Sequence, residues 1–293
     1  MAGRTAIALL AVFLSVFMQF CQTANEPEDI LAATALFPLF DWCQNIAPSG
    51  SQVVLLQPPL AVLPFSELDL TQAKRIHQAK LIVRVGYGWD EWVTEYIQDA
   101  VEEKQEIIDL QKWQEERIAE IASSSESERE TNPRLWLDPI WAQEAVRCLA
   151  DRMKAILPEK ESEIEERTQA YLLALNRLHR EIGEALAILP HKEYAIAGGS
   201  FAPFARRYGL AETAYADGKE LAEALRNRPR SVIFVETSNQ KRGFRVIKEE
   251  KAGNVLPLDA LGAPNDPERG SYIETMRYNL NSFKKGLSNG VDG

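Results

Sequence analysis

The chain has 293 residues, 45% of them hydrophobic, which is enough to build one large or two medium-sized domains. Its 43 acidic and 33 basic residues give a formal net charge of −10, and the basic residues form no run. Binding to the phosphate backbone of a nucleic acid depends on grouped lysines and arginines. The composition therefore argues against a nucleic-acid partner.

Residues 1–24 read as an apolar leader. Arg4 precedes a charge-free run from Ala6 to Phe20, which is short for a membrane span and suits the core of a signal peptide. Cys21 is a candidate for lipid attachment, although the large Phe20 stands where a small residue is expected. We expect an exported protein, either periplasmic or membrane-anchored outside the cytoplasm. An uncleaved membrane anchor is the alternative, and contact with the membrane would be confined to an N-terminal lipid or anchor.

Strand-like and helix-like segments alternate after this leader. The expected strands are residues 32–36, 53–56, 81–85 and 107–110, and the expected helices are residues 40–46, 69–78 and 89–101. The segment 81–85 is almost continuously apolar, which is typical of a parallel strand buried on both faces. The alternation predicts a layered α/β lobe.

The middle of the chain contains the clearest helical pattern. Residues 123–131 are polar and of low complexity, so we expect a loop there, followed by a helix at 139–157. In residues 159–189 apolar side chains recur at spacings of three, four or seven. They are Ile164, Tyr171, Leu175, Leu178, Ile182 and Leu186. A helix of this size is about 45 Å long, at about 1.5 Å per residue, and can span two lobes.

The second half repeats the α/β alternation. Strands are expected at residues 194–197, 231–235 and 254–258, and helices at 201–208, 219–226, 240–249 and 270–287. The predicted fold class is α/β, with two lobes built on central parallel sheets, one long linking helix and a ligand cleft between the lobes. The expected division is a signal peptide at 1–24, a first lobe at 25–157, the linking helix at 158–189 and a second lobe at 190–293.

Seven short blocks in order carry a resemblance to a known family. They are Leu36-Phe37-Pro38-Leu39, residues 79–86, Trp136-Leu137-Asp138-Pro139, residues 204–210, Phe234-Val235-Glu236, residues 258–262 and residues 272–280. Together, around a long central helix, they resemble the zinc and manganese solute-binding proteins of bacterial ABC transporters. The resemblance implies an exported receptor, not an enzyme, with an ABC transporter permease as its partner.

The same resemblance implies where a metal would bind. The family uses three histidines, or two histidines and a glutamate, together with one aspartate. Counting from the matched blocks places these four positions at Pro64, Arg134, Gly198 and Asp259. Only Asp259 keeps a ligand type, and Arg134 puts a fixed cation where the family has a histidine. We therefore expect no zinc or manganese at the family site and no cofactor.

Two hypotheses follow for the altered cleft. A carboxylate buried without a metal needs a partner, so the first is an Arg134–Asp259 ion pair that bridges the lobes. The second is a small anionic ligand bound by Arg134 and by the helix N-terminus at Gly198-Gly199-Ser200. The apolar walls of that site would come from Phe65, Trp136 and Phe201. Alternatively, the two glycines form only a tight turn with a serine cap.

Other readings of the chain are weaker but stay open. A rebuilt metal site would need Asp259, Glu236 and water, since His77, His179 and His191 are expected to be surface or structural residues. The chain has no dinucleotide, phosphate-loop or nucleophile-elbow motif, so catalysis is not expected. A non-transport interaction module remains an alternative function. We expect Cys43 and Cys148 to be buried thiols, with a disulfide between them as the alternative.

Overall fold

The computed structural model describes residues 29–56, 70–100, 105–120, 134–197, 199–215, 220, 221, 223, 232–236 and 255–288. Several features predicted from the sequence lie outside these residues. They are the leader, the polar loop at 123–131, the helix expected at 240–249, and the candidate site residues Pro64, Phe65 and Gly198. Within the described residues no helix is long and apolar enough to cross a membrane.

The first lobe is built on a four-stranded parallel sheet. In their order across the sheet, the strands are β2 (Gln52–Leu55), β1 (Ile30–Thr34), β3 (Leu81–Arg84) and β4 (Glu106–Asp109). In the centre Ala32 pairs with Leu81 and Thr34 with Val83. Strand β1 is buried along its whole length, as expected of a parallel strand covered by helices on both faces.

The second lobe repeats this arrangement. Its strands are β6 (Ala211–Tyr215), β5 (Glu193–Ala197), β7 (Ile233–Glu236) and β8 (Val255–Leu258), again in order across a parallel sheet. The sequence pattern did not indicate β6. This strand lies at the sheet edge and is half-buried or exposed throughout, so its residues show no apolar run.

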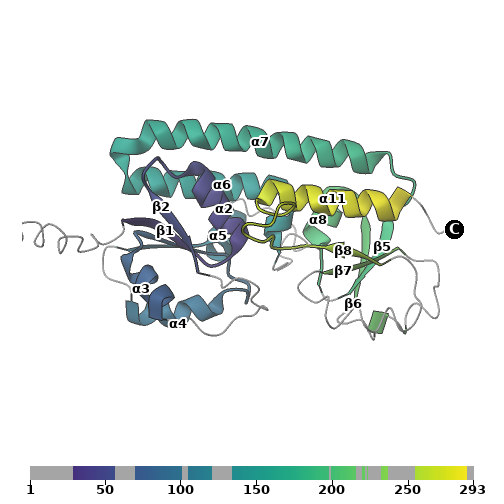
Figure 1. Cartoon of the computed structure of the whole chain (residues 1–293), viewed down its shortest axis with the longest axis horizontal. Helices are drawn as coiled ribbons and strands as arrows, with labels where there is room; N and C mark the ends of the chain where they lie inside the picture. The colour runs from purple at the N-terminus through teal and green to yellow at the C-terminus, as the bar shows by residue number, and fades with distance from the viewer. Residues whose placement is uncertain are drawn as a thin grey trace, which may run out of the picture.

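The helices surround these sheets. They are α2 (Phe37–Ile46), α3 (Leu70–Gln78), α4 (Glu91–Ala100), α5 (Leu110–Glu120), α6 (Pro139–Ile156), α7 (Glu161–Ala187), α8 (Ala202–Arg207) and α11 (Tyr272–Ser288). Two 3-10 turns, η2 (Leu135–Leu137) and η3 (Pro158–Lys160), precede α6 and α7. In the first lobe α3 and α4 lie on the side of the sheet away from α7 (Figure 1).

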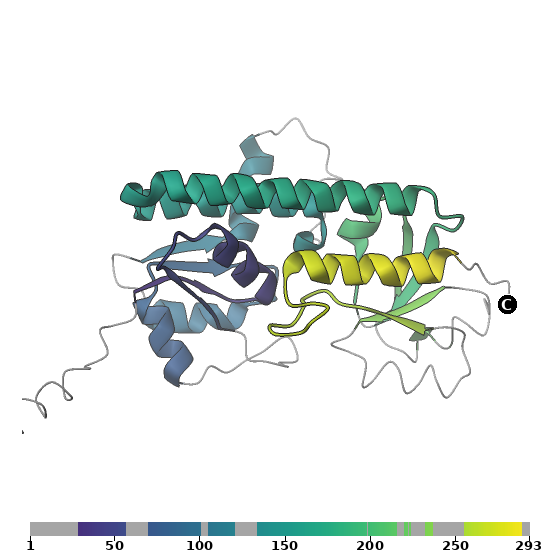
Figure 2. The ribbon, with the colours of Figure 1, turned by 45° about the horizontal axis from the view of Figure 1, so that its top comes forward.

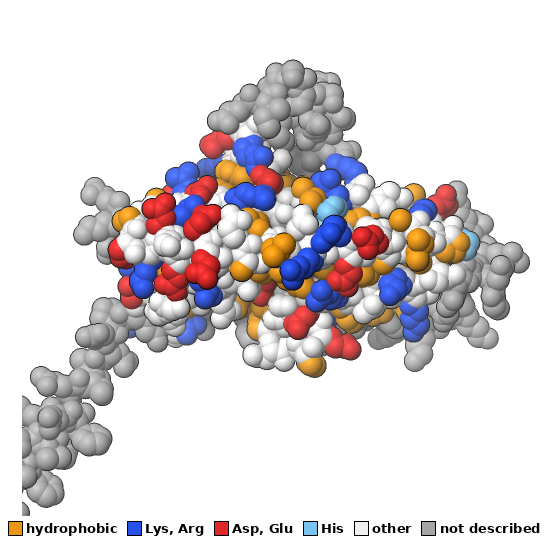
Figure 3. All heavy atoms as spheres, turned by 90° about the horizontal axis from the view of Figure 1, so that it is seen from above, with side chains coloured by type: hydrophobic (Ala, Val, Ile, Leu, Met, Phe, Trp, Pro, Cys, Tyr) orange, Lys and Arg blue, Asp and Glu red, His pale blue; other side chains and the backbone are white. Residues whose placement is uncertain are grey.

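The long helix α7 runs along both lobes, with α6 beside it in the first lobe and α11 beside it in the second (Figures 1 and 2). Its buried side chains include all six that the sequence pattern singled out, from Ile164 to Leu186, together with Thr168 and Leu172. Its outer face carries charged side chains of both signs (Figure 3). The predicted α/β class, with two lobes joined by one long helix, is confirmed.

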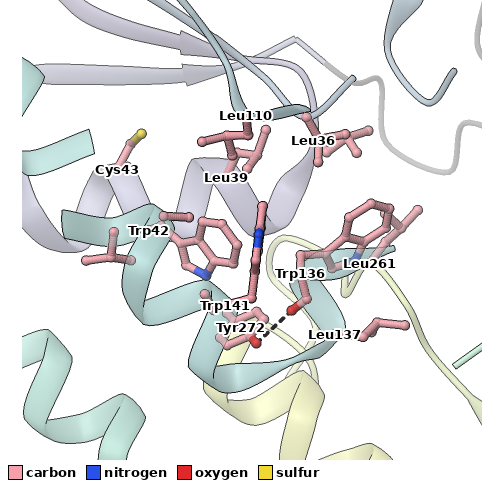
Figure 4. Packing of buried hydrophobic residues seen from close by; sticks show 14 of the residues in the cluster. Leu36, Leu39, Trp42, Cys43, Leu110, Trp136, Leu137, Trp141, Leu261 and Tyr272 are labelled. Carbon is pink, nitrogen blue, oxygen red and sulfur yellow. Dashed lines mark hydrogen bonds between the residues drawn. The ribbon is translucent and has the colours of Figure 1, made fainter. Parts of the chain in front are cut away.

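One hydrophobic core extends through both lobes. At its centre the ring of Trp42 from α2 packs edge-on against Tyr272 of α11, with ring centroids 5.3 Å apart, and Trp141 of α6 lies 6.2 Å from Trp42 (Figure 4). The hydroxyl of Tyr272 donates a hydrogen bond of 2.7 Å to the backbone oxygen of Trp136. The lobes are therefore packed together beneath α7, not merely tethered by it.

Two helices of the first lobe differ from the prediction. Helix α2 begins three residues earlier than predicted, with Pro38 in its first turn, where proline is tolerated because no N–H is needed. Helix α5 was missed because its apolar residues have little periodicity.

Cys43 is buried, Cys148 is partly buried, and both are free, so the disulfide alternative is wrong. Burial raises the pKa of both thiols.

Candidate functional site: an arginine-filled cleft

The candidate site lies where strand ends of the second lobe meet the first lobe. Glu236 ends β7, and Asp259 directly follows β8, the neighbouring strand. Arg134 approaches from the first lobe as the residue before η2, and Gly199 follows β5. The carboxyl ends of parallel strands share one sheet edge, so this topology brings the two carboxylates to a common edge.

Arg134 forms a buried ion pair with Glu236. Its Nη2 lies 2.9 Å from Glu236 Oε2, and the two side chains are 7% and 2% exposed. The expected Arg134–Asp259 pair is therefore wrong in its partner, because Asp259 binds a different arginine. A guanidinium of one lobe does pair with a carboxylate of the other, as expected, but that carboxylate is Glu236. A pair this deeply buried is held by mutual neutralisation, since either group alone would be a desolvated charge.

An aromatic ring covers the guanidinium. The Cζ of Arg134 lies 4.6 Å from the centre of the Trp89 ring, and Trp89 packs edge-on against Trp136 at 5.5 Å. A tryptophan face is the most favourable aromatic partner for a cation. Trp89 was not among the residues predicted for the site. The signal that could have found it is the pair of glycines beside it, Gly86 and Gly88.

The loop that presents Trp89 has an unusual backbone. Gly86, Tyr87 and Gly88 have φ angles of 78°, 55° and 80°, a run in the left-handed region that is costly for tyrosine. Asp90 holds the loop, since its carboxylate accepts hydrogen bonds from the backbone N–H groups of Val85 at 2.6 Å and Gly86 at 2.8 Å. Complete burial raises the pKa of Asp90 to about 7 in spite of these bonds.

Gly199 allows the ion pair to form against the backbone. A Cβ atom at this position would lie 2.5 Å from Glu236 Oε2 and 2.7 Å from Arg134 Nη1. Both distances are shorter than normal contacts, so a larger residue would displace the charged groups. Gly199 was predicted as part of an anion site, and its described role is to make room for the chain's own ion pair.

Asp259 is fully engaged by groups of its own lobe. Its Oδ1 accepts from the backbone N–H groups of Leu261 at 2.9 Å and Gly262 at 3.0 Å, and its Oδ2 accepts from Arg269 Nη1 at 2.8 Å. The side chain of Asn279 in α11 bonds both backbone polar groups of Asp259. Arg269 did not stand out in the sequence, because it lies in the polar loop between β8 and α11.

The helix start proposed for an anionic ligand is occupied by a carboxylate of the chain. Glu212 from β6 accepts hydrogen bonds from the backbone N–H of Phe201 at 2.7 Å and from Ser200 Oγ at 2.6 Å. Ser200 Oγ also accepts from the N–H of Ala202, in the manner of a serine cap. Helix α8 has only six residues. These contacts favour the alternative in which Ser200 is a serine cap, and Gly198 lies outside the described residues.

Two of the three aromatic residues expected as apolar walls of the site belong to the core. Phe201 and Trp136 are 0% and 1% exposed. The Nε1 of Trp136 donates a hydrogen bond of 2.6 Å to the backbone oxygen of Ala260, the residue after Asp259. Trp136 thus joins the lobes instead of lining an open pocket.

The described residues of the cleft offer few free donors to a divalent metal. In the described part of the chain no three histidine, cysteine, aspartate or glutamate side chains come together. Both carboxylates at the sheet edge already bind guanidinium groups. Of the three histidines, His77 and His191 are exposed, and His179 bonds the hydroxyl of Tyr208 at 3.0 Å. Their expected surface or structural roles are consistent with these positions.

A second ion pair joins the lobes near the cleft. Arg207 of α8 forms a bidentate pair with Asp138, with distances from 2.6 to 3.0 Å. Asp138 also caps α6 by accepting from the N–H of Ile140 at 2.9 Å. The lobes are therefore connected on the cleft side by Arg134, Trp136 and Asp138, each bonding a residue of the second lobe.

Comparisons with known proteins agree with this architecture. Residues 33–286 match the family described as ZnuA, zinc-uptake complex component A, periplasmic. The chain is 23% identical over 300 residues to the zinc-binding lipoprotein AdcA of Streptococcus pneumoniae, covering 94% of this chain and 60% of that protein. It is 24% identical over 313 residues to the metal ABC transporter substrate-binding lipoprotein SloC of Streptococcus mutans, covering 96% and 98%.

Solved structures show the same fold. The Zn(II)-bound ZnuA-like domain of Streptococcus pneumoniae AdcA superposes with a TM-score of 0.72 at 20% identity, covering 89% of this chain and 99% of that domain. At this identity the likeness speaks for the fold alone. The present chain spans 60% of the length of the whole AdcA protein.

Proposed function

Because the chain belongs to the family of periplasmic zinc-uptake components, we propose that it is an extracytoplasmic solute-binding receptor whose family metal site has been replaced by an internal cation. The guanidinium of Arg134 takes the role of the divalent metal as the positive charge between the lobes. The partner we propose is an ABC transporter permease, as the name of the SloC relative suggests. The protein acts by binding and is not an enzyme.

The buried ion pair between Arg134 and Glu236 carries this proposal. A divalent metal at this place would have to lie beside a fixed cation in a region of low dielectric. Even at an effective dielectric of about 20, two unit charges about 4 Å apart interact with about 4 kcal/mol, and a divalent ion roughly doubles this repulsion. Glu236 is also already neutralised by Arg134, so it offers little attraction to a further cation.

The geometry supports a closed arrangement that needs no solute. In a two-lobe receptor, a ligand that contacts both lobes favours the closed state by its differential affinity for that state. Here Arg134 supplies the contact permanently from within the chain. The bonds of Trp136 with Ala260 and of Asp138 with Arg207 act in the same direction. Along the back, α7 is continuous, so a hinge there would have to bend a 27-residue helix.

Elemental analysis of the purified protein, followed by zinc and manganese titration calorimetry, tests the proposal. We expect less than stoichiometric metal after purification without chelator, and no saturable heat for either ion at micromolar concentrations. Small-angle scattering should give the same radius of gyration with zinc, with manganese and with chelator. Tight binding of one zinc or manganese per chain that is lost in Asp259→Asn would overturn the proposal.

The same calorimetry distinguishes the anionic-ligand alternative. Titration with inorganic phosphate, acetate and citrate should give no saturable heat if Glu212 and Glu236 fill the anion positions from within the chain. Saturable binding of any of these anions that is lost in Arg134→Gln would favour the anionic-ligand function instead. Pull-down of the permease by the natural chain, but not by a fold-matched control, would separate the transport receptor from a non-transport interaction module.

A further inference from the structure

We propose that Arg269 is a second determinant of metal exclusion, acting on Asp259 as Arg134 acts on Glu236. The inference rests on the proposed function and deepens it. Asp259 is the one family ligand that this chain retains, so its chemical state decides whether loss of Arg134 alone would return a metal site. The contacts of Arg269 indicate that it would not.

Arg269 holds the outer oxygen of Asp259. Its Nη1 lies 2.8 Å from Asp259 Oδ2, while the inner Oδ1 is held by the backbone N–H groups of Leu261 and Gly262. Asp259 is 4% exposed. Both oxygens thus face donors of the same loop, and a metal would have to displace the guanidinium to reach the carboxylate.

Arg269 is itself held in place. Its Nη2 binds Asp266 Oδ2 at 2.6 Å, and its Cζ lies 5.4 Å from the centre of the Tyr278 ring. Its backbone N–H donates to Asp266 Oδ1 at 3.0 Å. Hydrogen bonding to Asp266 raises the pKa of Arg269, with a further contribution from the charge of Asp259. The guanidinium is therefore a fixed charge, not a mobile side chain that a cation could easily push aside.

The loop that carries Arg269 is packed against the first lobe. Gly262 has a φ of 80°, and a Cβ there would lie 2.5 Å from Thr275 Oγ1 and 2.8 Å from the ring of Phe37 in α2. The hydroxyl of Thr275 in turn donates to the backbone oxygen of Arg269 at 3.2 Å. Withdrawal of Arg269 from Asp259 would disturb this packing, so the block on Asp259 is built into the loop.

The charges of the sheet edge balance without a metal. Glu236 and Asp259 contribute two negative charges, and Arg134 and Arg269 contribute two positive charges. A divalent cation would supply the same total from one atom. Two guanidinium groups supply it from two places, Arg134 at Glu236 and Arg269 at Asp259, although Arg269 also binds Asp266 outside the sheet edge. Neither carboxylate of the sheet edge is left available for sharing.

A two-by-two set of variants tests the role of Arg269. Arg134→His introduces an imidazole beside Glu236, and Arg269→Gln releases Asp259 while keeping an amide donor in the loop. Imidazole and carboxylates are suitable ligands for zinc. We expect the double variant to bind zinc at least 10-fold more tightly than Arg134→His alone, measured by competition with a chromophoric chelator. Arg269→Gln alone should bind no better than the natural chain, because Arg134 remains.

Two further variants separate exclusion from a merely structural role. Arg134→His with Arg269→Lys keeps a cation beside Asp259, so its affinity should match that of Arg134→His. Arg134→His with Arg277→Gln is the matched control, since Arg277 forms a surface pair with Glu181 at 2.9 Å. Cobalt absorption spectra should gain intensity only in the double variant that releases Asp259.

Equal zinc affinity with and without Arg269→Gln, or no binding by either variant, would overturn the role of Arg269. Thermal unfolding of each variant identifies any that fail to fold. If Arg269→Gln fails to fold, the zinc affinities of Arg134→His with and without Arg269→Lys are compared instead. A failure of the proposed function has a different signature, namely stoichiometric metal in the natural chain. The two outcomes are therefore distinguishable.

Discussion

Asp90 in the first lobe and Glu236 in the second are both buried near the end of a parallel strand, but different groups hold them. Asp90 accepts hydrogen bonds from two backbone N–H groups of its own loop. Glu236 binds a guanidinium that arrives from the other lobe, 102 residues earlier in the chain. One carboxylate shapes a loop, and the other joins two lobes.

The difference shows two ways of keeping a carboxylate in a protein interior. Backbone N–H groups are neutral, so Asp90 remains a desolvated acid whose pKa rises to about 7. A guanidinium neutralises the charge itself, but it does so only while both lobes keep their relative positions. The stability contributed by Asp90 should therefore depend on pH, whereas loss of Arg134 should leave Glu236 as an uncompensated buried charge.

Removal of Arg134 is expected to have the largest effect. Arg134→Met leaves Glu236 buried beside an apolar side chain, and breaking a buried pair from one side costs about 3 to 5 kcal/mol. Urea denaturation measures the change in the free energy of unfolding. The double variant Arg134→Met with Glu236→Gln should regain most of the loss. A loss below about 1 kcal/mol in the single variant would contradict an ion pair that joins the lobes.

Asp90 should give a pH-dependent effect of the next size. Its folded pKa of about 7 lies above the ordinary value of 3.8, so its contribution to stability is complete below about pH 4 and is lost as pH rises through 7. At about 1.4 kcal/mol per unit, this loss is about 3 kcal/mol between pH 5 and pH 8. Denaturation curves of the natural chain and of Asp90→Asn measure it.

In Asp90→Asn this part of the pH dependence should disappear, because an amide does not titrate in this range. If Asp90→Asn kept the full slope, the carboxylate would have to be ionised throughout the range, and the contrast between the two acids would fail.

Gly199→Ala should be less damaging than loss of Arg134. The new methyl group would press on Glu236 Oε2 and Arg134 Nη1, and overpacking of this kind costs about 1 to 3 kcal/mol. In a Glu236→Ala background the methyl group has more room, so its cost should fall by at least about 1 kcal/mol. Additive costs in this double-mutant cycle would mean that Gly199 acts independently of the pair.

Arg207→Gln should have the smallest effect. Arg207 also joins the lobes, through Asp138, but its side chain is 39% exposed. Solvent-exposed pairs contribute about 0 to 1 kcal/mol, and their contribution falls with added salt. Unfolding at low and high salt concentration should show this dependence for Arg207→Gln and little of it for Arg134→Met. If Arg207→Gln lowered the free energy of unfolding as much as Arg134→Met does, burial could not explain the difference between the two ion pairs.

The sequence predicted the lobes and the long helix well because their signals are local or repeated. The block Trp136-Leu137-Asp138-Pro139 identified the start of α6, and the spacing from Ile164 to Leu186 identified the buried face of α7. Burial on both faces made β3 visible as an apolar run. Strand β6, at an exposed edge, offered no such run and was missed.

The sequence drew attention to Arg134, Glu236 and Asp259 but paired Arg134 with the wrong carboxylate. Glu236 and Asp259 lie at the ends of adjacent strands, and sequence spacing cannot tell which of two neighbouring carboxylates a guanidinium reaches. Arg269 binds Asp259 although it lies only ten residues further along the chain. It lies in a loop whose path depends on Gly262 packing against Phe37. Glu212 reaches Ser200 from the unpredicted strand β6. The missing information was tertiary in each case.

The last helix sets when the molecule can finish folding. Phe283 of α11 is fully buried and packs against Tyr194, Phe201, Phe204 and Phe234, so it fills the centre of the second lobe. Tyr272, at the other end of α11, lies against Trp42 of the first lobe. The core cannot close in either lobe until residues 272–288 are present. Shortening the chain within α11 should therefore leave the core incomplete in both lobes, not only in the second.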